Sequence, residues 1–172
     1  MEDTSKTCCF LGHREIEVTE ELQDKLYLAI ERLIVEKGVN RFLLGSKSKF
    51  NSLCYQVVSK VKESYPDIIR VYVRSAYQHI SDGYKDYLLE GYEETYYPEQ
   101  IANSGKASYV ERNQEMIDKS DFCIVYYDEN YLPPRRRNSR RDLTDYQPKS
   151  GTKVAYDYAV RKKKTIINML DD

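Results

Sequence analysis

The apolar residues of this chain follow two alternating patterns. Short, nearly continuous apolar runs typical of buried β-strands occupy residues 7–11, 41–45, 68–73, 122–127 and 165–170. Between them, apolar residues recur at every third or fourth position, as in helices that bury one face. Short hydrophobic strands joined by amphipathic helices form parallel sheets covered on both sides. The pattern therefore predicts an α/β fold.

Two of the predicted helices have clear boundaries. A helix over residues 19–37 has Thr19 as N-cap and Gly38 where a left-handed C-cap is favoured. The next helix stops at Tyr65-Pro66, because proline disfavours helical geometry in the residue before it. Its apolar face consists of Phe50, Leu53, Cys54, Val57, Val58 and Val61. Further helices are expected over residues 107–121 and 150–164.

The remaining segments have weaker patterns. Residues 75–105 predict only a short helix near 85–89 and a short strand at 94–97, and residues 128–149 form a long polar loop. The complete prediction is a Rossmann-like, mostly parallel sheet with helices on both faces, in a single domain over residues 1–172.

The ends of the strands carry the first candidate site residues. In an open parallel sheet, ligands bind outside the carboxyl ends of the strands, near the point where the strand order reverses. The candidates that follow the first three strands are Gly12, His13, Arg14, Gly45, Ser46 and Arg74.

His13 and Arg14 are unusual residues at the end of an apolar strand. Arg14 suits phosphate oxygens, because the guanidinium offers paired donors, but it could instead pair with Glu15 or Glu17. His13 could donate a hydrogen bond to a ligand, act as a structural histidine, or act as an acid or base. We expect Arg14 to contact a negatively charged part of a ligand, with His13 donating a hydrogen bond nearby.

A second candidate site lies in the segment KSGTKVAYDYA. Ser150, Gly151 and Thr152 open a helix, and the first N–H groups of a helix are ready donors to an anion. Gly151 would let a phosphate approach the backbone. Simple N-capping by Ser150 is the alternative interpretation.

Composition narrows the class of protein. The 172 residues have a formal net charge of −1, with 41% hydrophobic and 32% charged residues, as in ordinary soluble globular chains. Near-neutral charge gives no reason to expect a nucleic-acid or membrane partner. No apolar run approaches the roughly 20 residues of a membrane span, and the first residues show no signal-peptide pattern. We expect a cytoplasmic protein.

Cysteine and tyrosine content adds two expectations. The four cysteines follow neither a zinc spacing nor a disulfide framework, so we expect buried free thiols in a reducing compartment. They are Cys8, Cys9, Cys54 and Cys123. Tyrosine is common, at 17 residues, and some of its rings could stack on a base. His79 is interpreted as a surface residue.

Three segments together resemble a known superfamily. They are CCFLGHRE from Cys8, YVERNQEMIDKSDFCIVYYDE from Tyr109 and SGTKVAYDYAVRKKKTIINML from Ser150. In this order they resemble the SLOG superfamily of Rossmann-like nucleotide binders, which includes the DprA and LOG families, and most closely its YpsA-like branch. The resemblance implies a pocket for a nucleotide or an NAD- or ADP-ribose-related ligand. It also implies a homo-oligomer by analogy.

The same resemblance points to Arg112 and Asn113, on the helix before the fourth apolar run. Taken alone, Arg112 would be explained equally well by a surface salt bridge. At Gly45 the chain departs from the glycine-rich turn usual in YpsA-like proteins, because Lys47 and its neighbours replace the small residues. Lys47 or Lys49 could supply a charged contact there instead.

A second departure concerns catalysis. LOG enzymes have a catalytic glutamate three residues after the threonine of this turn, where this chain has Ala155. Asp157 lies five residues after Thr152, about 200° from that position around a helix, so it cannot substitute directly. YpsA-like proteins can carry an acid at the Asp157 position, which makes it a candidate pocket residue. We assign no catalytic residue, metal ligand or cofactor.

The arginine-rich part of residues 131–149 is not explained by the resemblance. It contains Arg135, Arg136, Arg137, Arg140 and Arg141. A solvated insertion, a lid over a polyphosphate and a nucleic-acid contact all remain open.

These observations favour a protein that binds a nucleotide-derived small molecule. It would act as a sensor or a sequestering protein, in bacterial defence or phage counter-defence. One alternative is an N-glycosidase or phosphoribohydrolase acting on a nucleoside monophosphate, against which the missing glutamate counts. Another is a DprA-like nucleic-acid-associated protein, favoured by the arginine-rich segment alone.

Overall fold

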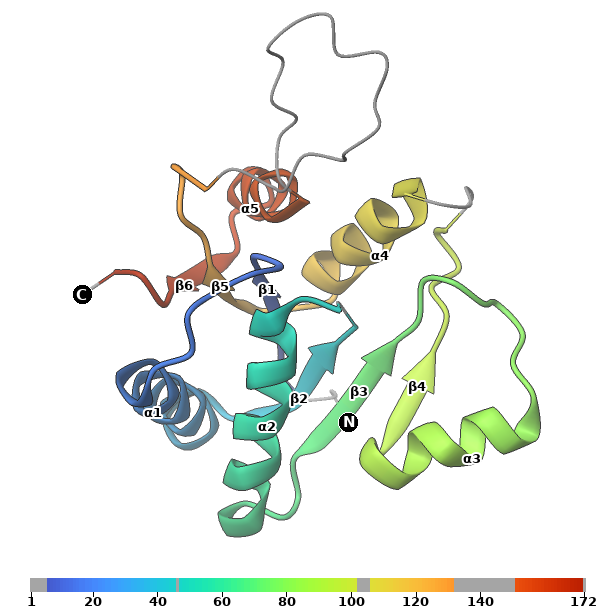
Figure 1. The fold of residues 1–172 in the computed structure, drawn as a ribbon. Helices are drawn as coiled ribbons and strands as arrows, with labels where there is room; N and C mark the ends of the chain where they lie inside the picture. The colour runs from blue at the N-terminus through green and yellow to red at the C-terminus, as the bar shows by residue number, and fades with distance from the viewer. Residues whose placement is uncertain (1–5, 46, 102–105, 132–150, 172) are drawn as a thin grey trace, which may run out of the picture.

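The protein has a six-stranded sheet in which all neighbouring strands are parallel (Figure 1). The computed structural model describes residues 6–45, 47–101, 106–131 and 151–171. The strand order is β4-β3-β2-β1-β5-β6. The strands are β1 (Lys6–Gly12), β2 (Val39–Leu44), β3 (Ile69–Val73), β4 (Glu94–Tyr96), β5 (Phe122–Tyr126) and β6 (Thr165–Asn168). The predicted Rossmann-like α/β class is confirmed.

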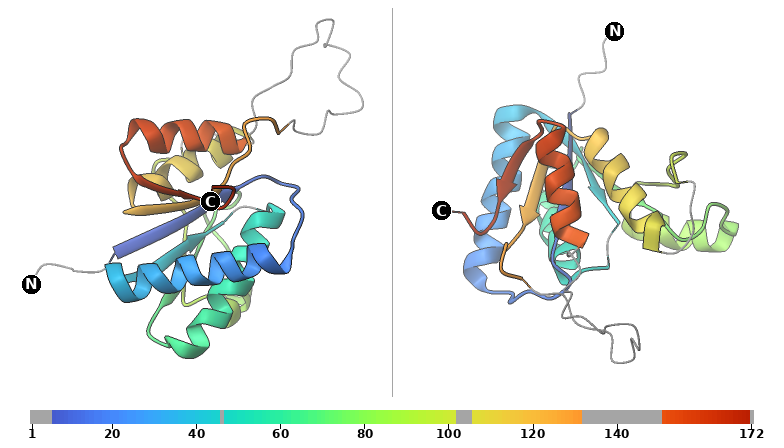
Figure 2. Two further views of the ribbon diagram at one scale, coloured as in Figure 1. Left: turned by 90° about the vertical axis from the view of Figure 1, so that its left-hand side faces the viewer. Right: turned by 90° about the horizontal axis from the view of Figure 1, so that it is seen from above.

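Helices cover both faces of this sheet, as predicted (Figure 2). The helices are α1 (Glu20–Lys37), α2 (Lys49–Ser64), α3 (Asp82–Gly91), α4 (Lys106–Asp118) and α5 (Gly151–Arg161). Helices α1 and α2 pack side by side on one face, and α4 and α5 on the other. Helix α3 lies alongside the edge strand β4 (Figure 1).

The core divides into one layer on each side of the sheet. On the α1 and α2 side, Phe10, Phe42 and Phe50 are fully buried, and every predicted residue of the α2 apolar face is buried. On the α4 and α5 side, Leu43, Met116 and Ile117 pack with residues of β3 and β5. All four cysteines are buried and free, as predicted. The Sγ atoms of the register partners Cys9 and Cys123 lie 3.6 Å apart.

The ends of α1 follow the sequence signals. The hydroxyl of Thr19 accepts a hydrogen bond from the backbone N–H of Leu22, and Gly38 adopts a left-handed φ of 72°.

Two other helices differ in length from the prediction. Helix α5 ends at Arg161, earlier than expected, and Lys163 adopts a φ of 57° in the turn that follows. Helix α3 is twice the length expected from residues 85–89; it was hard to predict because Leu88 is its only buried residue.

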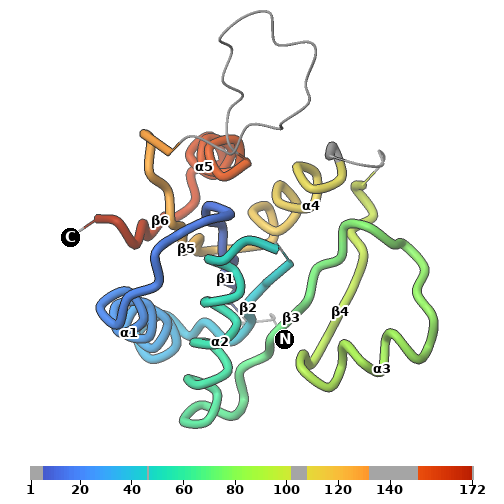
Figure 3. Tube along the Cα trace, viewed as in Figure 1, coloured from blue at the N-terminus to red at the C-terminus, as the bar shows by residue number. Residues whose placement is uncertain are grey.

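The strand order reverses beside β1. From β1 the chain runs through β2 and β3 to the edge strand β4, whereas β5 and β6 lie on the other side of β1 (Figure 3). The carboxyl ends of β1 and β5 therefore flank the switch point of this sheet. Ligands of open α/β sheets bind at such a point.

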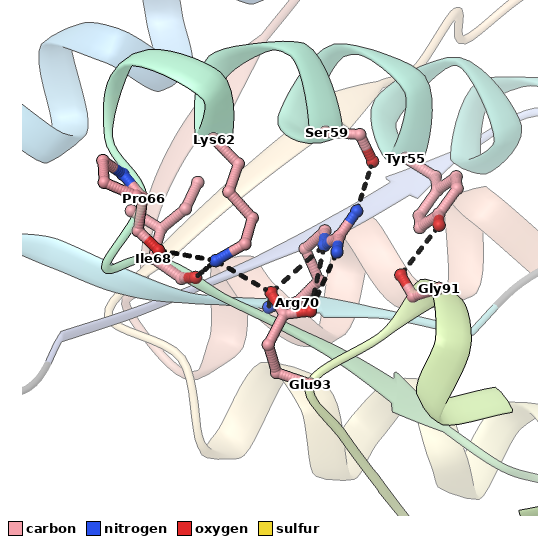
Figure 4. Close-up of polar contacts among 8 residues, drawn as sticks. All are labelled: Tyr55, Ser59, Lys62, Pro66, Ile68, Arg70, Gly91 and Glu93. Carbon is pink, nitrogen blue, oxygen red and sulfur yellow. Dashed lines mark hydrogen bonds and ion pairs between the residues drawn. The ribbon is translucent and has the colours of Figure 1, made fainter. Parts of the chain in front are cut away.

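A polar cluster fixes the edge of the sheet to α2 (Figure 4). The guanidinium of Arg70 on β3 contacts both carboxylate oxygens of Glu93 and donates to Oγ of Ser59 at 2.9 Å. Lys62 pairs with the same carboxylate at 3.2 Å. The hydroxyl of Tyr55 donates to the carbonyl oxygen of Gly91 at 2.7 Å. These contacts tie α2 and β3 to the chain entering β4.

Replacing Glu93 by glutamine is expected to lower the free energy of unfolding by about 1–2 kcal/mol at pH 7. Burial acts to raise the pKa of the Glu93 carboxyl, but hydrogen bonds from Arg70 and Lys62 together hold the pKa below its ordinary value of 4.5. This stabilisation is therefore present above about pH 4.5 and is lost as the pH falls through the lower folded-state pKa. Urea unfolding at pH 7 and at pH 3.5 should show the difference between the two proteins shrinking at the lower pH.

The matched control is Glu36→Gln. Glu36 is exposed on α1 and has no ion pair among the described residues. This variant removes the same charge without removing an ion pair, so its effect at pH 7 should be small. A Glu93→Gln difference that is the same at both pH values would contradict the pKa argument.

Candidate functional site

A cavity of about 350 Å³ lies at the carboxyl end of β1, beside the switch point. This volume is within the range of small-molecule sites. Its walls come from the turn after β1, the β2–α2 turn, α4, the segment after β5 and the first turns of α5. The described lining residues are Leu11, Gly12, His13, Arg14, Lys47, Ser48, Tyr109, Arg112, Asn113, Tyr131, Gly151, Thr152 and Ala155.

The cavity wall is positively charged. Among the described lining residues, Arg14, Lys47 and Arg112 are cationic, and none is an aspartate or glutamate. The described part of the chain also contains no group of three or more histidine, cysteine or acidic residues arranged to hold a metal ion. The wall therefore suits an anion.

Arg112 is the most unusual of these residues, because its side chain is buried without an acidic partner. The residue is 4% exposed and makes no ion pair among the described residues. Nη1 donates to the carbonyl oxygen of Gly45 at 2.6 Å and to Oγ of Ser75 at 3.1 Å. Nε and Nη2 both donate to Oδ1 of Asn113, at 3.3 Å. Among the described residues, Arg112 therefore forms no surface salt bridge, which was the alternative interpretation from the sequence.

The charge of Arg112 remains in place at neutral pH. Burial lowers its pKa to about 10, an effect that neighbouring Tyr72 and Tyr109 partly oppose. The guanidinium centre also lies 5.5 Å from the centroid of the Tyr109 ring. A buried cation surrounded by neutral acceptors is costly, and an anion in the adjoining cavity would offset that cost.

His13 supplies a neutral donor beside the same cavity. It is 1% exposed, and its Nε2 accepts a hydrogen bond from the backbone N–H of Asp128 at 2.8 Å. Burial lowers its pKa below 6.5, although contacts with Asp128 partly oppose the shift. The proton of the neutral ring therefore sits on Nδ1, which is buried and has no partner among the described residues. The ring stacks on Tyr131, with centroids 3.9 Å apart.

Arg14 lines the cavity with an exposed side chain. Of its two suggested partners, Glu15 pairs instead with Lys49 at 3.2 Å, and no ion pair joins Arg14 to Glu17 in the described residues. The carbonyl oxygen of Arg14 accepts from the backbone N–H of Lys49 at 2.9 Å. This bond fixes the turn after β1 against the start of α2.

The turn after β1 also depends on Gly12. A Cβ at this position would lie 2.2 Å from Cδ1 of Phe50, which is fully buried at the start of α2. Buried Asn51 links the same region, donating to the carbonyl oxygen of Phe10 at 3.2 Å and accepting from the backbone N–H of Gly45. Close packing therefore explains Gly12, which also lines the cavity.

Helix α5 begins at the cavity. Gly151, Thr152 and Ala155 all line it, so the position of the LOG glutamate faces this cavity as an alanine. Asp157 is not brought to the cavity; its carboxylate pairs with Lys153 at 3.2 Å instead. This placement follows from the angle around the helix that separates Asp157 from Thr152.

Of the other predicted site residues, two line a second cavity and two lie outside the described residues. Gly45 and Arg74 line a smaller neighbouring cavity, which shares Lys47, Tyr109 and Arg112 with the first. Ser46 and Ser150 lie outside the described residues, as do the arginines of the 131–149 segment. His79 is exposed, as expected.

Sequence reasoning did not identify four lining residues: Leu11, which was predicted only as the end of the first strand, and Ser48, Tyr109 and Tyr131. Ser48 is the N-cap of α2, and a cap gives no separate signal that it also borders a cavity. The tyrosine content suggested aromatic contacts, but nothing in the sequence pattern distinguishes Tyr109 and Tyr131 from the other tyrosines.

Searches against protein-family models and against curated proteins find no match to this sequence. A solved structure of DNA processing protein A from Helicobacter pylori is similar, with a TM-score of 0.55 and 14% sequence identity. The match covers 94% of this chain and 63% of that chain, so this chain spans less than two thirds of the neighbour's length. The reported structure of the neighbour concerns its binding of single-stranded DNA. At this identity the similarity establishes a DprA-like fold alone.

Within the described residues, no helix is both long enough and apolar enough to span a membrane.

Proposed function

We propose that this protein binds a nucleotide-derived, anionic small molecule in the cavity beside β1, as a sensor or a sequestering protein. The observation that carries the proposal is Arg112, a buried guanidinium at the cavity wall without a carboxylate partner among the described residues. The resemblance to the YpsA-like branch of the SLOG superfamily, and to its NAD- and ADP-ribose-related ligands, is part of this proposal.

Two further groups support an anionic ligand. The first turn of α5 lines the cavity, and the N-terminus of a helix attracts negative charge through its first N–H groups. The Nδ1–H of His13 is a buried donor beside the cavity with no partner among the described residues. Arg112, α5 and His13 reach the cavity from three separate elements, so they can bind different oxygen atoms of one phosphate-containing ligand.

A phosphoribohydrolase remains the weaker alternative. Such a reaction needs a carboxylate near the scissile bond, and the described cavity wall has Ala155 where LOG enzymes have glutamate. Among the described lining residues, His13 is the one imidazole, and burial lowers the pKa of its ring although contacts with Asp128 partly oppose the shift. These features favour binding over hydrolysis.

The fold similarity to DNA processing protein A keeps a nucleic-acid ligand as the second candidate. Single-stranded binding sites combine basic grooves with aromatic rings, and this cavity has Arg14 and Lys47 together with Tyr109 and Tyr131. A single-stranded oligothymidylate should therefore be included in any binding comparison.

The test is to denature the purified protein and identify the released small molecules by mass spectrometry. Calorimetric titrations of the ligand-free protein with AMP, ADP-ribose, NAD and oligothymidylate accompany it. A released nucleotide, or micromolar binding of one of the three small molecules, supports the proposal. No release and no binding up to millimolar concentration would contradict it, and binding of the oligothymidylate alone would favour the second candidate.

Gly151→Asp is expected to lower affinity for ADP-ribose about tenfold or more, because it places a negative charge where the ligand phosphate meets the start of α5. The ligand-free variant should be no less stable than the wild type, since an acidic residue in a first helical turn is favourable. Calorimetry and thermal unfolding measure the two effects.

Gly151→Ala is the matched control. Among the described residues, no atom lies within 4 Å of a Cβ at Gly151, so the methyl group adds bulk toward the ligand but no charge, and it should cost less affinity than the aspartate. Equal loss of affinity in both variants would indicate that space, rather than charge, matters at this position.

A further inference from the structure

A second, smaller cavity adjoins the first at the carboxyl ends of β2 and β3. Its volume is about 70 Å³, against about 350 Å³ for the first cavity. The second cavity is therefore much the smaller of the two. Lys47, Tyr109 and Arg112 line both cavities, so the buried guanidinium stands between them.

The polar part of this second cavity is cationic. Arg74, Arg112 and Lys47 line it, and none of its described lining residues is acidic. Nε of Arg74 is buried and has no partner among the described residues. Nη1 of Arg74 has only a long bond, 3.3 Å, to the carbonyl oxygen of Tyr77. The guanidinium of Arg74 therefore has N–H groups that are not hydrogen-bonded by the described residues.

The outer part of the second cavity is aromatic. Tyr77 is 66% exposed, Tyr84 is 40% exposed and Tyr109 is 43% exposed, and all three line it. They come from three elements: the segment after β3, α3 and α4. Exposed aromatic rings beside unpaired cations are the combination on which nucleotide bases stack.

We propose that the second cavity binds the second unit of a free dinucleotide, a small molecule with two nucleoside units joined through phosphates. This inference rests on the proposed function. The first unit occupies the larger cavity, the linking phosphates lie at Arg112, and Arg74 binds the negative charge nearer the second unit. The second ring stacks on the exposed tyrosines at the outer part of the small cavity.

The two cavities predict different affinities for mononucleotides and dinucleotides. A mononucleotide uses the first cavity, including α5 and His13, and gains nothing from Tyr77 or Arg74. A dinucleotide uses both. Stacking of one base on aromatic side chains contributes about 1–3 kcal/mol, so we expect the protein to bind NAD at least about fivefold more tightly than AMP. ADP-ribose, which lacks the second base, should lie between them.

The experiment compares AMP, ADP-ribose and NAD by calorimetry in the wild type, Tyr77→Leu and Arg74→Gln. Both variants should lose affinity for NAD about fivefold or more and keep their affinity for AMP. Tyr27→Leu is the matched control for the ring: Tyr27 lies on α1, is partly buried and lines neither cavity. Arg32→Gln, at an exposed position of α1, is the control for the charge.

Each outcome decides the inference. If AMP and NAD bind equally well to the wild type, or if NAD is preferred but neither variant changes the preference, the second subsite is wrong while the proposed function stands. If no small molecule binds, both are wrong. Should Arg74→Gln unfold, Tyr77→Leu still decides, because the exposed ring does not support the core. An oligothymidylate that binds more tightly than NAD would overturn the assignment to a free dinucleotide.

Discussion

Arg112→Gln is expected to lower the affinity for ADP-ribose by at least about 30-fold. Removing one partner of a buried, hydrogen-bonded charge pair costs about 2–5 kcal/mol of binding, and Arg112 is the buried cation at this cavity wall. Calorimetric titration of the wild type and the variant measures the change directly.

The ligand-free variant should lose much less stability than affinity. The glutamine amide can still donate toward the carbonyl oxygen of Gly45, and the change removes a buried charge whose desolvation opposes folding. The lost hydrogen bonds to Ser75 and Asn113 act in the other direction, at about 1 kcal/mol each. We expect these contributions largely to cancel in urea unfolding.

Arg70→Gln is the matched control, and we expect it to lose stability rather than affinity. Arg70 is also largely buried, but its guanidinium pairs with Glu93 at 2.9 Å and lies away from both cavities. This variant should lose about 1–3 kcal/mol of stability and keep its affinity for ADP-ribose. If instead Arg112→Gln loses stability as Arg70→Gln does and keeps its affinity, Arg112 is a structural residue and the proposed site is wrong.

Gly12→Ala should destabilise the protein by about 2–3 kcal/mol or more. The new Cβ would lie 2.2 to 2.6 Å from three side-chain atoms of Phe50, and Phe50 has no exposed surface into which it can move. Forcing an extra methyl group into a close-packed core typically costs about 1–3 kcal/mol. Chemical denaturation of the wild type and the variant measures the loss.

Two comparisons isolate the clash. Gly83→Ala, at the start of α3, adds the same methyl group where no atom lies within 4 Å, so it should be nearly neutral. Combining Gly12→Ala with Phe50→Leu should destabilise less than the sum of the two single variants, because the smaller leucine makes room for the Cβ. Strict additivity would show that Phe50 is not the cause.

The sheet and its main helices could be predicted because burial imposes a repeating pattern. Every predicted residue of the α2 apolar face is buried, and Thr19 and Gly38 cap α1 as their residue types suggested. The convergence of Gly12, His13 and Arg14 with Gly151 and Thr152 followed from the rule that strand ends meet at one edge.

The environment of each side chain could not be predicted in this way. Nothing in the sequence pattern indicates that Arg112 is buried, because its burial depends on Gly45 and Ser75, which follow β2 and β3 and contact its guanidinium. The roles of Gly12 and Asp157 were similarly open: a glycine needed for packing and one needed for a ligand look alike in sequence. Their ligand-binding roles, like those of the other candidates, remain predictions.

If a ligand binds at Arg112 as proposed, it would also change how long the protein survives. An anion that binds only the folded protein beside Arg112 would stabilise the folded state by an amount that grows with the logarithm of the free ligand concentration once this exceeds the Kd. Because degradation often proceeds through transiently opened molecules, fewer such molecules would be exposed to proteases when the ligand is abundant. Turnover of the chain would then depend on the supply of its ligand, so the amount of intact protein would itself record that supply.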